Sequence, residues 1–188
     1  MAVLVPVLGI AGSGTSGAAT DLNAPVLASL SITPASVNTE DGPAAVTIEA
    51  RLTDETSPSI GGRVPLSHVA LTGPGGQQRA VAYLSHANRI SGGPTDGVYR
   101  TTVSLPWHAE PGRWNASAEL VDTLGHAAAL TTAQLGGRGI DQTGAGDTTA
   151  PQLLALTVAP ATVDTNTAAA TLSVTARVAD DLAGVSSG

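Results

Sequence analysis

The sequence predicts an all-β protein, a seven-stranded antiparallel β-sandwich followed by the start of a second copy. Its apolar residues recur with period two rather than 3.6, and Gly, Pro, Asn and Asp interrupt them roughly every eight to twelve residues. No segment offers ten residues of helical periodicity. Residues 24–62 recur without a gap at residues 150–188, which indicates a duplicated structural unit.

The two copies lie 126 residues apart, and 13 of their 39 aligned positions are identical. Arg51 matches Arg177, and Asp54 matches Asp180. The second copy has room for only its first two strands, so we expect the chain to be a fragment. Two strands without a partner sheet are marginal in water, and we expect residues 150–188 to form no core of their own.

Seven strands are expected in the first copy, over residues 26–32, 45–53, 67–72, 78–85, 98–105, 113–121 and 127–133. The glycine-rich run 73–78 is interpreted as the turn between the third and fourth strands, because no helix follows it as a phosphate-binding loop requires.

The strand assignments rest on one-sided alternation, which is clearest in three runs. The apolar members are Val46, Ile48, Ala50 and Leu52; Tyr99, Val103 and Leu105; and Trp114, Ala116, Ala118 and Leu120. Antiparallel sheets with one packed face show this pattern, so two such sheets are expected to face each other across an aliphatic core. Trp114 has the inward parity and is predicted to be the central core aromatic.

Four segments are expected along the chain. Residues 1–19 have the shape of a signal peptide, although no Lys or Arg precedes their apolar run; a buried first strand is the alternative. Residues 20–135 form the sandwich, 136–149 a Gly-rich linker and 150–188 the truncated second copy.

Composition excludes several classes of function. The eight cations, all Arg, are outnumbered by fifteen acids, and the net charge of -7 argues against nucleic acid and anionic membranes as partners. The absence of Cys excludes disulfide scaffolds, zinc-thiolate sites and thiol catalysis. The four histidines, His68, His86, His108 and His126, stand without the sequence neighbours of a catalytic base, so no enzyme is predicted.

Four stretches in order, residues 24–54, 95–106, 110–126 and 147–151, resemble the tandem immunoglobulin-like (Ig-like) repeats of secreted or surface-attached bacterial proteins. The resemblance covers about residues 21–188 and implies an Ig-like β-sandwich in a tandem array outside the cell. In the family, the turn after the sixth strand usually reads Asp-x-x-Gly-Asn; here Asp122 and Gly125 are followed by His126.

Four carboxylates are predicted to gather at one end of the sandwich. Asp54 and Asp122 continue the inward parity of their strands by one step, with Glu55 adjacent to Asp54 and Asp21 on the chain that leads in. In a seven-stranded Ig topology these strand ends lie at the same pole on opposite sheets. The group is therefore a candidate calcium site, the only cofactor predicted; the alternative is that each Asp caps its own turn.

Two aromatic residues are candidate ligand contacts, Trp107 in the loop after Pro106 and Tyr83. Trp107 is expected either to plug the open end of the sandwich or to stand exposed as a stacking platform.

The function expected is that of a non-catalytic extracellular spacer, presentation or adhesion module, secreted or at the cell surface. Its partners would be neighbouring domains of the same polypeptide and a cell-surface protein or polysaccharide. The alternative is a carbohydrate-binding module attached to a secreted hydrolase.

Overall fold

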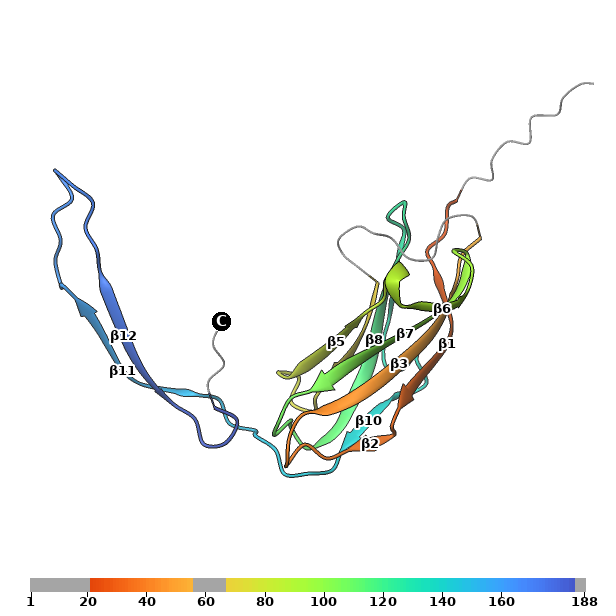
Figure 1. The fold of residues 1–188 in the computed structure, drawn as a ribbon, viewed down its shortest axis with the longest axis horizontal. Helices are drawn as coiled ribbons and strands as arrows, with labels where there is room; N and C mark the ends of the chain where they lie inside the picture. Colours follow the sequence, from red (N-terminus) through yellow and green to blue (C-terminus); the bar gives the residue numbers. More distant parts are fainter. Residues whose placement is uncertain (1–20, 56–66, 185–188) are drawn as a thin grey trace, which may run out of the picture.

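The computed structural model describes residues 21–55 and 67–184. The segment shaped like a signal peptide, residues 1–19, lies outside the described residues, and so does the end of the expected second copy, residues 185–188. Strands dominate the described part, and the 3-10 turn η1 (His86–Asn88) is its one helical piece. The all-β prediction is confirmed, and the strands form sheets that are mainly antiparallel (Figure 1).

The first sheet has four antiparallel strands in the spatial order β1-β3-β7-β6. Their bounds are β1 (Val26–Thr33), β3 (Ala44–Thr53), β6 (Arg89–Gly92) and β7 (Asp96–Leu105). The central pair, β3 and β7, stays in register from Ala44 opposite Leu105 to Thr53 opposite Asp96. On the face of this sheet that points away from the core, two ion pairs join β3 and β7: Arg51 with Asp96, and Arg100 with Glu49, each at 2.7 Å.

The second sheet has the order β2-β10-β8-β4-β5, and β9 also pairs with β8. Its strands are β2 (Ser36–Val37), β4 (His68–Thr72), β5 (Arg79–Tyr83), β8 (Gly112–Val121), β9 (Ala127–Leu130) and β10 (Gly139–Gln142). β9 pairs with residues 118–121 of β8 and β10 with residues 112–115, so the two follow one another along one edge of β8. The short β10–β2 pair is parallel.

The core lies between the two sheets and takes residues from both. Val46, Ile48 and Leu52 of β3 and Trp114 and Leu120 of β8 are fully buried in one cluster. Apart from Trp114 and Tyr99 the cluster is aliphatic, as the composition predicts. The core position of Trp114 is confirmed, and its indole Nε1 donates a hydrogen bond to the Glu110 carbonyl at 2.8 Å.

The seven expected strands all occur, but three further strands were missed, and one of these corrects the expected linker. Residues 139–142 form β10 inside the second sheet, with Ile140 buried, so the sandwich extends beyond residue 135. Two of the glycines there allow close packing, whereas Gly136 and Gly137 have open space at their Cβ positions and a positive φ. A Cβ at Gly139 would lie 2.1 Å from the Trp114 carbonyl oxygen, and one at Gly146 would lie 1.9 Å from that of Ala109. The other missed strands, β2 and β6, are short.

β11 (Gln152–Ala159) and β12 (Ser173–Ala179) form a separate antiparallel hairpin that extends away from the sandwich (Figure 1). No residue of either strand is buried, as the sequence predicts for this segment. The pairing repeats that of β1 with β3 position by position: Val26 faces Thr53, and Gln152 faces Ala179. Each pairing also has a register shift near the start of its first strand, between Leu27 and Ser29 in β1 and between Leu153 and Ala155 in β11.

Candidate functional site

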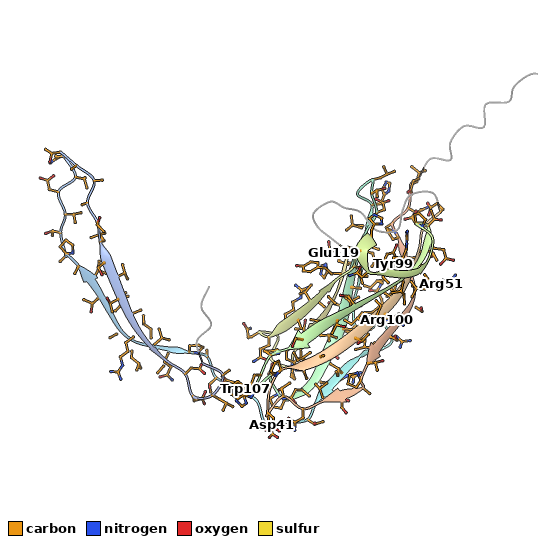
Figure 2. All side chains as sticks on the ribbon, viewed as in Figure 1. Asp41, Arg51, Tyr99, Arg100, Trp107 and Glu119 are labelled. Carbon is orange, nitrogen blue, oxygen red and sulfur yellow. The ribbon has the colours of Figure 1, made fainter. Side chains whose placement is uncertain are left out.

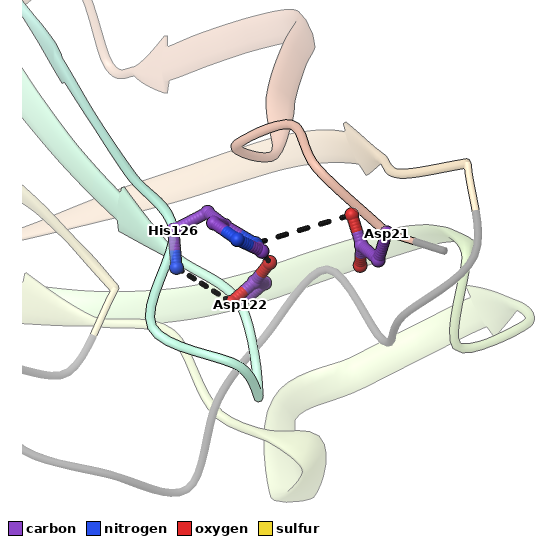
Figure 3. Close-up of side chains that lie close together, drawn as sticks. All are labelled: Asp21, Asp122 and His126. Carbon is purple, nitrogen blue, oxygen red and sulfur yellow. Dashed lines mark hydrogen bonds and ion pairs between the residues drawn. The ribbon is translucent and has the colours of Figure 1, made fainter.

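Carboxylates gather at the end of the sandwich where the chain enters β1, as the strand parities predict. Asp54 follows β3 in the first sheet, Asp122 follows β8 in the second, and Asp21 precedes β1. Asp21, Asp54 and Glu55 present ligand atoms within 4.8 Å of one another, and so do Asp21, Asp122 and His126. Asp21 therefore belongs to both groups, and Figure 3 shows it opposite the turn that carries Asp122 and His126.

Asp122 is fully buried and closes its own turn, in agreement with the turn-cap alternative. Its Oδ1 accepts hydrogen bonds from the backbone N–H groups of Leu124, Gly125 and His126 at 2.5 to 2.8 Å. Its Oδ2 lies 2.7 Å from His126 Nδ1. Burial raises the pKa of Asp122, but the hydrogen bonds from the His126 side chain and the three backbone groups outweigh it, and the pKa is lowered.

His126 is marked in the sequence as a change in this turn, but its contact with Asp122 was not predicted from the sequence. Its hydrogen bond to Asp122 raises its pKa above the usual value of 6.5, with further help from the charges of Asp21 and Asp54. The Asp21 carboxylate lies 4.0 Å from His126 Nδ1. A positively charged His126 thus offsets part of the repulsion among the carboxylates. The Asp-x-x-x-His spacing within one turn was the available signal.

We expect the stability of the domain to decline as the pH rises through the folded-state pKa of His126. Because that pKa is raised, the charged pair stabilises the fold fully below the unfolded pKa of about 6.5 and loses this contribution above the folded value. In acid the same stabilisation is lost at a second point, because the pKa of Asp122 is lowered and its carboxylate becomes protonated as the pH falls through that folded-state pKa. Thermal melts between pH 5 and 9 measure the upper limb. In His126→Gln this limb should be flat; a decline equal to that of the wild type would contradict the assignment.

The donor set of Asp21, Asp54 and Glu55 is that of a hard cation, since calcium takes carboxylate oxygens. Asn23 is the neighbour of this group: its side-chain amide donates to Glu55, and its backbone N–H donates to Asp21 Oδ1 at 3.3 Å. Asp122, with both oxygens engaged in its own turn, is less suited to a metal than its three neighbours. Calcium binding here stays a prediction.

Calcium at a few millimolar should raise the melting midpoint of the chain relative to the same protein in chelator, because a ligand that binds only the folded state stabilises it. Asp54→Asn should abolish this difference. Glu119→Gln, an acid on the outer side of β8, is the matched control and should keep it. Coincident melts of the wild type with calcium and with chelator would leave the carboxylates as turn caps and charge partners of His126.

A second acidic group occurs at the start of the hairpin. Asp147, Asp180 and Asp181 lie within 4.8 Å of one another, and each stands 126 residues after a member of the group formed by Asp21, Asp54 and Glu55. Backbone hydrogen bonds from Thr149 and Ala183 lower the pKa of Asp147. The two acidic groups are thus related by the same offset of 126 residues that relates β11–β12 to β1–β3.

Trp107 and Tyr83 are both exposed, at 56% and 54%, so Trp107 does not plug the sandwich. Its indole Nε1 donates to the Glu40 carbonyl at 2.8 Å, and its ring stacks on His108, which has a left-handed φ of 54°.

The two aromatics lie at opposite ends of the sandwich. Tyr83 faces His68, which in turn faces Glu119, and Figure 2 shows Glu119 and Trp107 at opposite ends. The structure does not bring them together as one platform.

His126 is hydrogen-bonded to a carboxylate, but that carboxylate also holds three backbone N–H groups of the same turn. Four hollows of the described surface have no histidine in their walls. The expected turn at residues 73–78 is confirmed between β4 and β5, where the Gly76 N–H donates to the Gly73 carbonyl.

Comparison of the chain with protein-family models, with curated proteins and with solved structures found no match. Within residues 21–55 and 67–184, no helix is long and apolar enough to span a membrane.

Proposed function

We propose that this chain is a non-catalytic Ig-like repeat module that acts as a spacer, presentation or adhesion unit in a larger secreted or surface protein. The observation that carries the proposal is the recurrence of the β1–β3 pairing, with its register shift, in β11–β12 at an offset of 126 residues. A unit that recurs in strand register, and not only in sequence, is typical of tandem arrays, in which neighbouring domains of the same polypeptide are the first partners.

The strand order supports the Ig-like part of the proposal. Ig sandwiches of constant type place strands A, B, E and D in one sheet and C, F and G in the other. In the spatial order of the first sheet, β1, β3, β7 and β6 correspond to A, B, E and D, and in the second sheet β4, β8 and β10 correspond to C, F and G, with β5 as a further strand beside β4.

A spacer also needs a stable domain with polar outer faces. The outer face of the first sheet carries the Arg51–Asp96 and Arg100–Glu49 pairs, and the net charge of -7 disfavours self-association. The acidic groups recur where the chain enters each unit, so calcium there would stiffen the joints of an array.

Cell fractionation with an antibody to residues 67–142 tests the location. We expect the protein in the medium or on the cell surface of the producing organism, in a polypeptide longer than this chain. Detection in the cytoplasm alone would contradict the proposal.

The exposure of Trp107 and Tyr83 favours a second candidate, a carbohydrate-binding module of a secreted hydrolase. Binding modules stack sugars on exposed aromatic faces, but here the two rings lie at opposite ends and cannot form one platform. Affinity electrophoresis in gels containing cellulose derivatives, xylan or chitin derivatives separates the candidates. The spacer predicts equal mobility of wild type, Trp107→Ala and Tyr83→Ala in every gel; retardation of the wild type that is lost in Trp107→Ala would favour the second candidate.

A further inference from the structure

The apolar face of the β11–β12 hairpin is uncovered, whereas its counterpart in the sandwich is the core. Val174 is 64% exposed and Ile48, the residue 126 positions earlier, is fully buried. Leu156, Leu172 and Val178 are exposed while their counterparts Leu30, Val46 and Leu52 are buried, and Val158 is exposed while its counterpart Ile32 is partly buried against the core.

One edge of β12 is also open. β3 pairs with β1 on one side and with β7 on the other along ten residues. Among the described residues β12 pairs with β11 alone. Its outer edge therefore presents backbone N–H and C=O groups that can accept another strand.

The sandwich shows which strand chemistry fits such an edge. On β3, the small Ala50 faces Tyr99, Leu52 faces Gly97, and Ile48 faces Thr101 of β7. β12 keeps the same alternation of small and aliphatic residues, with Ala176, Val178 and Val174 at these positions.

Charge favours the same kind of strand. Arg51 of β3 holds Asp96 of β7 through two hydrogen bonds, at 2.8 and 2.7 Å. Arg177 occupies the equivalent position on β12, and within the described part of the chain it forms no ion pair. An incoming strand with an acid at the place of Asp96 would complete this pair.

We propose that the outer edge of β12 is a strand-acceptor site for an antiparallel strand of β7 chemistry, supplied by a separate polypeptide segment. Such a strand carries an acid first, an aromatic residue three positions later on the apolar side, and hydroxyl or aliphatic residues after it. The β7 strand of the same chain is not available, because it lies between β3 and β6. The inference rests on the proposed equivalence of β12 and β3.

The absence of Cys from the chain permits a disulfide-trapping test on the full protein. The probe is a synthetic peptide of residues 94–106 with Thr102→Cys, and the protein carries Ser173→Cys. Thr102 faces Thr47 in the sandwich, and Ser173 is the residue 126 positions after Thr47. Opposed residues of paired strands lie within the Cα separation that a disulfide requires. In a glutathione redox buffer we expect a mixed disulfide of protein and peptide.

The matched control is the same peptide with Val103→Cys in place of Thr102→Cys. A shift by one residue points the thiol to the other face of the sheet, so its yield should be far lower. Exchange of charge gives a second control: Arg177→Asp in the protein or Asp96→Arg in the peptide should each lower the initial trapping rate about two- to fivefold, and both together should restore it.

Three results would overturn the proposal: no adduct with the peptide, equal adducts with both peptides, or disulfide-linked dimers of the Ser173→Cys protein in place of the adduct, which would make a second copy the occupant. A separate variant, Thr157→Cys with Thr175→Cys, tests the hairpin itself, because these residues face each other across β11 and β12. If this internal disulfide forms and the peptide is not trapped, the strand-acceptor proposal is refuted and the proposed function is not. If the internal disulfide does not form, the equivalence behind the proposed function fails as well.

Discussion

Trp114→Ala should lower the free energy of unfolding of the sandwich by roughly 3 to 5 kcal/mol, the range for large-to-small core substitutions. The indole is fully buried between the sheets and is one of only two aromatic residues in an otherwise aliphatic core. Small domains are stable by only about 5 to 15 kcal/mol, so the variant should unfold at a much lower urea concentration.

Trp107→Ala is the matched control, because Trp107 is more than half exposed, donates a hydrogen bond to the Glu40 carbonyl and stacks on His108. Its loss should cost about 1 kcal/mol or less. Urea titrations followed by circular dichroism compare the two variants. Equal midpoints for Trp114→Ala and the wild type would contradict the position of Trp114 in the core.

Backbone amides of β12 should exchange with solvent at least about a thousandfold faster than those of β3. An isolated hairpin is marginally stable at best, so its hydrogen bonds open locally, whereas the amides at the centre of β3 open only with most of the domain. Amide exchange by NMR over residues 172–178 and 48–52 measures the ratio.

Equal protection factors in these two segments would show that the hairpin is packed in solution. The comparison has an internal control, because the strands β1 and β3 have the same register as β11 and β12 and differ mainly in being covered. A difference in exchange therefore reports the missing second sheet and not a difference in strand pairing.

The sequence predicts best those strands that have one solvent-exposed face and one buried face. In β3 the alternation of Val46, Ile48, Ala50 and Leu52 with polar residues gives the strand, its inward side and the side on which Asp54 lies. The placement of Asp54 and Asp122 at one end of the sandwich follows from those parities and from the topology, and in the structure each of them shares a group of ligand atoms with Asp21.

The elements that escaped prediction depend on tertiary partners. β10 contains Gly139 and the polar Gln142, and such residues are typical of a loop. Gln142 is nevertheless buried, and its side-chain amide donates to the carbonyls of Ala109 and Gly144. β6 is four residues long and ends in Gly92. The His126–Asp122 contact and the exposure of Trp107 are decided by side-chain directions in turns, and no periodicity in the sequence records those.

The central claim is that β11–β12 is the first hairpin of a second Ig-like unit, and a hairpin exchange tests it most directly. Residues 150–181 replace residues 24–55 in the full chain, an exchange of equal length. Four inward positions change: Ile32→Val, Val46→Leu, Ile48→Val and Leu52→Val. The expected cost is about 2 to 4 kcal/mol, which a domain of ordinary stability survives.

The control graft carries residues 149–180 instead, a shift of one residue that turns every side chain to the opposite face of the sheet. Near-UV circular dichroism of Trp114 during urea unfolding at about 15 °C, close to the usual temperature of maximum stability, is the measurement. The account predicts a cooperative transition for the in-register graft and none for the shifted graft. Loss of the transition in both grafts, even after Val174→Ile and Val178→Leu restore two of the three lost methylene groups, would contradict it.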